Sequence, residues 1–81
     1  MKTTSYFRDD VLSKRPYIRE EWCLAAIENP IGKEIQDNGR IRHWIFIEEV
    51  QKFFRVVTLD DGATVHNAFF DRTYKNKMRS K

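Results

Sequence analysis

Residues 31–70 read IGKEIQDNGRIRHWIFIEEVQKFFRVVTLDDGATVHNAFF, and half of the chain therefore lies in one region with a strand-like pattern. Its apolar side chains recur at a period of two, which is typical of β-strands. Short turn-forming stretches at 37–39, 50–51 and 60–62 interrupt the pattern. The strands predicted between them are residues 31–36, 40–49, 52–59 and 63–70. Because strands joined by tight turns pair antiparallel, we expect a four-stranded antiparallel meander. The Asn38-Gly39 pair predicts a type I′ turn in its first hairpin.

The residues before this stretch follow a helical period instead. Residues 6–15 place Phe7 and Val11 at helical spacing, and Pro16 ends the segment because the residue before a proline avoids the helical region. Residues 18–28 carry a second apolar stripe, which the following Asn-Pro pair ends. A sheet with one apolar face needs a covering layer. We therefore expect an α+β fold, with two N-terminal helices packed on one face of the sheet.

Length and composition limit which classes of protein the chain can belong to. Eighty-one residues make a single domain over 1–81. With one cysteine, a third of the residues charged, and no apolar run behind Lys2, we expect a cytoplasmic protein without a signal peptide or membrane segment. The chain has no Gly-rich phosphate loop and no spacing of metal ligands, so we expect neither a cofactor nor a metal.

The positive charge is concentrated at the C-terminal end. Residues 1–71 hold ten Lys and Arg against twelve Asp and Glu, whereas residues 72–81 hold five Lys and Arg and no acid. Two interpretations of this basic tail stay open: it contacts phosphates, or it is a solvated end of the chain.

Alternation along the strands sorts side chains between the two faces of the sheet. Ile41, His43, Ile45 and Ile47 form the set expected in the core. Our preferred pairing places Arg42, Trp44, Arg55 and His66 on the face away from the helices. Cations attract phosphates and an aromatic ring stacks on an unpaired base, so this face is a candidate RNA-binding surface.

Structural interpretations stand beside this one. The stem of Arg55 would pack among apolar neighbours while its head pairs with a carboxylate such as Glu48. His66 would be an ordinary surface or hydrogen-bonded histidine, and His43 a hydrogen-bonded core residue. Cys23 lies within an apolar helix, where an inert thiol is expected.

Several short runs resemble one family. They are Arg15–Ile18, Asn29-Pro30, Gly39–Trp44, Phe54–Val57 and Val65–Phe69. Over residues 6–72 the chain is similar to a small bacterial domain of the RelE/ParE/BrnT-like toxin superfamily. The resemblance implies two N-terminal helices on a twisted antiparallel sheet. It also implies the toxin half of a type II toxin–antitoxin module. Such a toxin is a metal-independent endoribonuclease that acts on mRNA, often ribosome-bound, and its partner is an antitoxin encoded nearby.

The same resemblance assigns site residues. Arg55 matches the arginine of the family's Leu-Arg-Val-Val strand, and Arg42 matches the basic position of the preceding strand. With Arg72 they would stabilise charge on the reacting phosphate, and His66 would transfer protons. The RNA contacts expected around this catalytic set are Arg40, Trp44, Tyr74, Lys75, Lys77 and Arg79.

The first helix departs from the family pattern. Relatives begin it with Ser-x-His-Ala, whereas this chain has Ser5-Tyr6-Phe7-Arg8 and lacks that histidine. The departure keeps a second function open, a non-catalytic RelE/ParE-like protein that binds a protein or nucleic-acid partner. A third possible function is that of a small structural or adaptor subunit.

Overall fold

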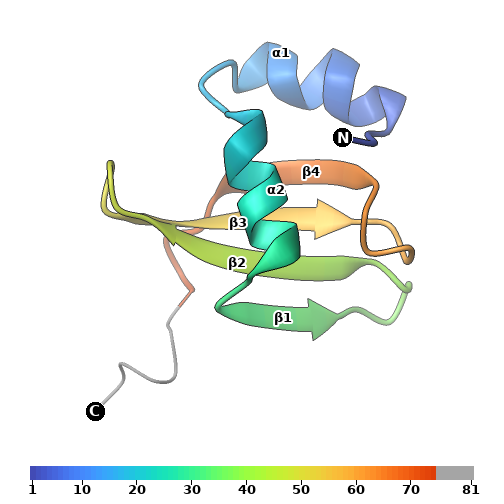
Figure 1. The fold of residues 1–81 in the computed structure, drawn as a ribbon. Helices are drawn as coiled ribbons and strands as arrows, with labels where there is room; N and C mark the ends of the chain where they lie inside the picture. The colour runs from blue at the N-terminus through green and yellow to red at the C-terminus, as the bar shows by residue number, and fades with distance from the viewer. Residues whose placement is uncertain (75–81) are drawn as a thin grey trace.

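The structure is a computed structural model, and it describes residues 1–74 (Figure 1). Its elements are η1 (Phe7–Val11), α1 (Leu12–Lys14), α2 (Glu20–Glu28), β1 (Gly32–Ile35), β2 (Ile41–Ile47), β3 (Lys52–Thr58) and β4 (Val65–Phe70). Each strand pairs antiparallel with the next, in the order β1-β2-β3-β4. The predicted α+β class and four-stranded meander are confirmed. Within residues 1–74, no helix has the length and apolar character needed to cross a membrane.

The first hairpin differs from the prediction in its turn. Gly39 has a positive φ of 88°, but Asn38 does not, so the predicted type I′ turn is wrong. The loop has three residues and is closed by the Gln36 N–H, which donates to the Arg40 carbonyl at 2.8 Å. Asn38 instead uses its side-chain oxygen to accept the Arg40 N–H at 3.0 Å. This is the three-residue hairpin loop in which a glycine takes the left-handed position.

The last strand begins later than predicted, at Val65 rather than residue 63. The Asp61 carboxylate accepts the N–H groups of Ala63 and Thr64, each at 2.9 Å. These two residues therefore belong to the turn, because their backbone donors are bound there and not to a strand.

The first helix is continuous through η1 and α1, and its η1 segment is wound more widely, as a π-helix. The Leu12 N–H donates to the Phe7 carbonyl, five residues back. Thr4 caps the helix, since its hydroxyl oxygen accepts the Phe7 N–H at 3.1 Å. Just before it, Thr3 forms a parallel bridge with Val65, so the N-terminal residues run beside the outer edge of β4.

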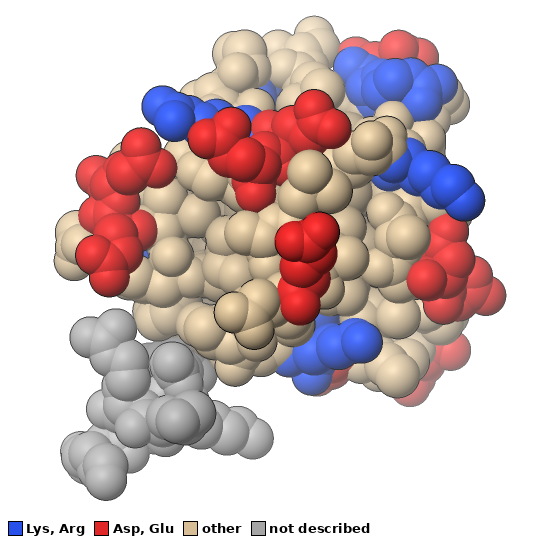
Figure 2. Space-filling model, in the orientation of Figure 1, with Lys and Arg blue, Asp and Glu red and all other residues tan. Residues whose placement is uncertain are grey.

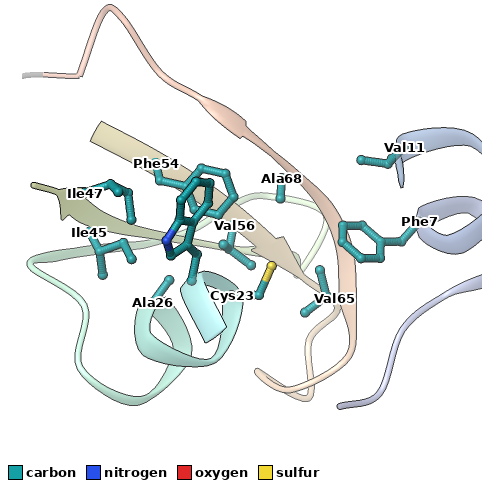
Figure 3. Packing of buried hydrophobic residues seen from close by; sticks show 11 residues of the cluster. Phe7, Val11, Cys23, Ala26, Ile45, Ile47, Phe54, Val56, Val65 and Ala68 are labelled. Carbon is teal, nitrogen blue, oxygen red and sulfur yellow. The ribbon is translucent and has the colours of Figure 1, made fainter. Parts of the chain in front are cut away.

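The core lies between the helices and one face of the sheet. In Figure 1, α2 crosses β2 and β3, and the first helix lies beyond β4. Figure 3 shows Phe7 and Val11 of the first helix directed toward Val65 and Ala68 of β4, while Cys23 of α2 lies among the strand side chains. All five are 1% exposed or less. Burial of such apolar side chains is the main stabilising contribution in a chain of this size.

The strands divide their side chains between a covered face and an open face. In β2, Ile41, His43, Ile45 and Ile47 are all buried, as predicted for the core set. We call the other side the open face; Arg42, Trp44, Arg55 and Phe69 belong to it by register.

A bulge breaks the alternation in β4. Thr58 pairs with Val65, but Val57 pairs with Asn67, so His66 is an extra residue in the ladder. Val65 and Ala68 can therefore both face the core although an odd number of positions separates them.

Candidate functional site: a pocket on the open face

A pocket of about 310 Å³ lies on the open face, and we call it the open-face pocket. It is lined by Tyr6, Gln36, Asn38, Arg40, Arg42, Arg55, Val57, His66, Asn67 and Phe69. The two β4 residues at the bulge, His66 and Asn67, both line it. The bulge thus brings the imidazole to the face that carries the arginines.

Three of the four predicted catalytic residues come together here. Arg42, Arg55 and His66 all line the open-face pocket, and so does the predicted RNA contact Arg40. Arg72 does not line it and instead borders a separate depression beyond the end of β4. The strands therefore supply two guanidinium groups and one imidazole to the pocket, without the fourth predicted residue.

Arg55 is held by Asp71, the residue that follows β4. One oxygen of Asp71 accepts hydrogen bonds from Arg55 Nε at 3.1 Å, Arg55 Nη2 at 2.7 Å and Trp44 Nε1 at 3.0 Å. The other oxygen accepts the backbone N–H of Thr73 at 3.0 Å, the Thr73 hydroxyl at 2.8 Å and the Tyr74 N–H at 3.1 Å. The Arg55 guanidinium is therefore fixed in place on the open face.

Asp71 stays ionised in this position. Asp71 is only 7% exposed, and burial alone would raise the pKa of its carboxyl group. The hydrogen bonds from Trp44, Arg55 and Thr73 outweigh burial and hold the pKa well below its usual range.

The sequence interpretation missed Asp71, and it named Glu48 as an example of a partner for Arg55. The available signal was an Asp directly after a strand with a Thr two residues on, which is the pattern of a turn closed by the Asp side chain.

Trp44 stacks on Tyr74. The two rings stack at 4.5 Å between centroids with 16° between their planes, and Trp44 is 6% exposed. Gly32 makes room for this stack, since a Cβ at that position would overlap the Tyr74 hydroxyl. Trp44 therefore packs within the open face, and the partly exposed Tyr74 lies over it.

Arg42 and Arg40 differ in their charge partners. Arg42 Nη1 donates to Glu34 Oε1 at 2.9 Å, and the Glu34 side chain is 56% exposed. Arg40 is exposed and makes no ion pair with any residue in the described part of the chain, 1–74. The phosphate group of a ligand would bind Arg40 directly. It would bind Arg42 by replacing Glu34 in a weak surface ion pair.

His66 is positioned by the N-terminal segment. Its Nδ1 lies 3.1 Å from the Thr4 hydroxyl, and the Tyr6 ring packs against the imidazole with a 5.0 Å centroid separation. The Thr4 oxygen accepts the Phe7 N–H and keeps one lone pair, which can accept a hydrogen bond from the Nδ1–H of His66. In that tautomer Nε2 carries a lone pair. Partial burial, and then the charge of Arg40, lower the pKa of His66, so the imidazole is neutral at pH 7.

The other titratable groups of the core are structural. His43 is 1% exposed, and its Nε2 lies 3.0 Å from the Thr58 hydroxyl, which confirms the prediction of a hydrogen-bonded core histidine. Burial raises the pKa of the Cys23 thiol to about 12, so Cys23 stays a neutral thiol.

Metal ligands do not gather in the described part of the chain: no three His, Cys, Asp or Glu side chains of residues 1–74 lie together as a metal site. The predicted RNA contacts Lys75, Lys77 and Arg79 lie outside the described residues. Comparison of the chain with models of protein families, with curated proteins and with solved structures found no match. The RelE-like resemblance stays a prediction.

Proposed function

We propose that this protein binds single-stranded RNA in the open-face pocket and cleaves it without a metal ion, as the toxin of a type II toxin–antitoxin pair. One observation carries the proposal. A neutral imidazole, His66, opens onto the same pocket as Arg40 and Arg42. A proton acceptor beside cations is the combination that transfer of a phosphoryl group from RNA requires.

The reaction uses the 2′-hydroxyl of the RNA as its nucleophile. Nε2 of His66 takes the 2′-hydroxyl proton while the 2′-oxygen bonds to the adjacent phosphorus. The bond from phosphorus to the 5′-oxygen breaks, and that oxygen takes a proton from water. The products are a 2′,3′-cyclic phosphate and a 5′-hydroxyl end, and His66 returns its proton to solvent.

The arginines have different roles in this proposal. Arg40 and Arg42 face the phosphate and stabilise the negative charge that develops on its oxygens. Arg55 is a positioning residue, because Asp71 already binds its guanidinium from two nitrogens. Its guanidinium lies 4.8 Å from the centre of the Phe69 ring and fixes the floor of the pocket.

An antitoxin would control this activity. The side of the molecule that carries α2 displays Asp and Glu in several separate groups with Lys and Arg between them (Figure 2). An acidic partner therefore fits the open face better than the helix side. We propose that the partner is an acidic protein, encoded nearby, that covers the open-face pocket. The proposed substrate is mRNA, ribosome-bound or free, and the proposed location is the cytoplasm.

The test is cleavage of a labelled single-stranded RNA by the purified chain in the presence of EDTA. Wild type should release fragments with 2′,3′-cyclic phosphate ends, and His66→Ala should lower the rate at least about 100-fold while it still binds RNA. The rate should rise with pH through the lowered pKa of His66 and then level off. Lys14→Gln on α1 is the control and should cleave normally. A wild-type chain that neither cleaves RNA nor arrests growth on induction would overturn the proposal.

A second function is favoured by the ion pairs. Arg42 and Arg55 each bind a carboxylate of the chain itself, Glu34 and Asp71, which reduces the charge available to a transition state. This favours the non-catalytic alternative, a RelE/ParE-like binding protein. Equal RNA binding by wild type and His66→Ala, with no cleavage by either, would establish it.

A further inference from the structure

A second pocket, of about 470 Å³, lies at the C-terminal end of β4 and has no role in the proposed reaction. We call it the second pocket. It is lined by Arg15, Tyr17, Lys52, Phe69, Phe70 and Arg72. Three separate parts of the chain supply its cations: the loop after α1, the first residue of β3, and the segment after β4.

The cations of the second pocket are not neutralised. Arg15, Lys52 and Arg72 form no ion pair with any carboxylate of residues 1–74. Two of them lie over aromatic rings instead: Arg15 is 5.6 Å from the centre of the Phe69 ring, and Lys52 is 5.2 Å from that of Phe70. Such contacts position a cation while they leave its charge available to an anion. The open-face pocket differs, because carboxylates bind two of its arginines.

An aromatic platform lies beside these cations. Tyr17 stacks on Phe70 at 5.5 Å between centroids with only 7° between the planes, and Tyr17 is 48% exposed. The stack holds the tyrosine ring in one orientation with much of its surface open to solvent. A flat, fixed and exposed ring next to cations has the chemistry to stack on a base whose phosphate the cations bind.

Phe69 connects the two pockets. It lines both of them, and its ring is approached by Arg55 at 4.8 Å and by Arg15 at 5.6 Å. A ligand that occupies the open-face pocket and continues along β4 therefore enters the second pocket next.

We infer that the second pocket binds the continuation of the single-stranded RNA held in the open-face pocket. Lys52, Arg72 and Arg15 bind a backbone phosphate, and the Tyr17 ring stacks on the adjoining base. This inference rests on the proposed function for the identity of its ligand, but it requires no cleavage.

The experiment measures binding of a fluorescent octaribonucleotide by anisotropy. A variant carrying Lys52→Gln and Arg72→Gln is compared with a matched variant carrying Lys14→Gln and Lys33→Gln, which removes the same charge elsewhere. At about 0.1 M salt each lost phosphate contact weakens binding by roughly fivefold, because affinity for single strands varies as about the −0.7 power of salt concentration per contact. We expect the first variant to lose both contacts, with a shallower salt dependence, and the matched variant to bind as wild type does.

Tyr17→Leu separates stacking from charge. It should weaken binding of the octaribonucleotide at least about fivefold without a change in salt dependence. A dinucleotide, which fills only the open-face pocket, should bind Tyr17→Leu and wild type equally.

Three results would overturn the inference. If both double variants bind RNA as wild type does while wild type cleaves it, the second pocket has no role and the proposed function stands. If wild type binds no RNA, both the inference and the proposed function fail. If an acidic peptide of equal charge competes as well as the octaribonucleotide, the pocket recognises charge alone and its assignment to nucleic acid is wrong.

Discussion

The two faces of the sheet are held by different interactions. On the covered face, Phe54 and Val56 are fully buried among apolar side chains of the helices and β4. On the open face, one carboxylate, Asp71, binds both Trp44 and Arg55. A sheet face without a covering layer can therefore still hold its side chains in fixed positions. It can do so while its arginines and an imidazole remain in reach of a ligand.

The largest effect should follow from opening a cavity on the covered face. Phe54 is 0% exposed and packs edge-on against Trp22 at 5.5 Å. Phe54→Ala should lower the free energy of unfolding by about 3 to 5 kcal/mol, measured by urea denaturation. Leu24→Ala, at an exposed position of α2, should change it by less than about 0.5 kcal/mol. Equal effects of the two substitutions would contradict the proposed location of the core.

On the open face, the largest loss of stability should follow from substitution of Asp71. Asp71→Asn removes the anion that Arg55 and Trp44 bind, and the 20% exposure of the Arg55 side chain allows water to compensate in part. We expect a loss of about 2 to 3 kcal/mol. Because the folded pKa of Asp71 is lowered, its contribution is complete above the ordinary value of 3.8 and declines as the pH falls below it. The difference between wild type and variant should therefore shrink in acid.

Glu34→Gln is the matched control for this substitution on the same face. Its pair with Arg42 is exposed, so the loss should stay below about 1 kcal/mol. A larger loss than that of Asp71→Asn would show that the order of the open face depends on β1 and not on the segment after β4.

The two histidines, one on each face, should make the stability of the chain depend on pH. Burial, and then Lys33, lower the pKa of His43 below 6.5. The unfolded chain therefore binds the proton more readily, and the unfolding free energy should fall as the pH drops below 6.5 toward the folded pKa. The pKa of His66 is also lowered, so protonation of His66 reduces the unfolding free energy in the same direction. Each contributes at most about 1.4 kcal/mol per pH unit. His43→Gln should reduce the slope of stability against pH, and an unchanged slope would show that His66 alone causes it.

The smallest effect should come from the turn between β2 and β3, which belongs to neither face. Gln51 has a φ of 55°, a left-handed conformation that costs a non-glycine residue energy. Its side chain recovers part of this by donating to the Glu48 carbonyl at 2.9 Å. Gln51→Gly should stabilise the chain by about 0.5 kcal/mol, seen as a small rise in melting temperature. Gln51→Ala, which keeps the strain and loses the hydrogen bond, should destabilise it.

Local sequence signals were enough for the strands and for most of the faces. The turn residues place each predicted strand boundary within two residues of the observed one. The alternation in β2 assigns Ile45 and His43 to the core, where both are buried. These features depend on neighbours within a few residues. A single sequence therefore contains them, and the same holds for the placement of Arg42 and Arg55 on the open face.

Features that depend on distant residues could not be predicted in this way. Strict alternation would place His66 on the same face as Ala68, and the bulge that separates them depends on how β4 pairs with β3. The Thr4–His66 contact joins residues 62 positions apart, and the Trp44–Asp71 bond joins residues 27 apart. Such pairs form only when the fold brings them together, so the sequence lacks a local signal for them.

Gly32 has a consequence for how the chain leaves the sheet. A methyl group there would compete with the Tyr74 hydroxyl for the same volume, and the tyrosine, as the free end of a side chain, would be the one to move. Its departure would open one surface of the Trp44 indole to water and loosen the loop that closes around Asp71. A single hydrogen atom in an edge strand thus decides where the Tyr74 ring can lie.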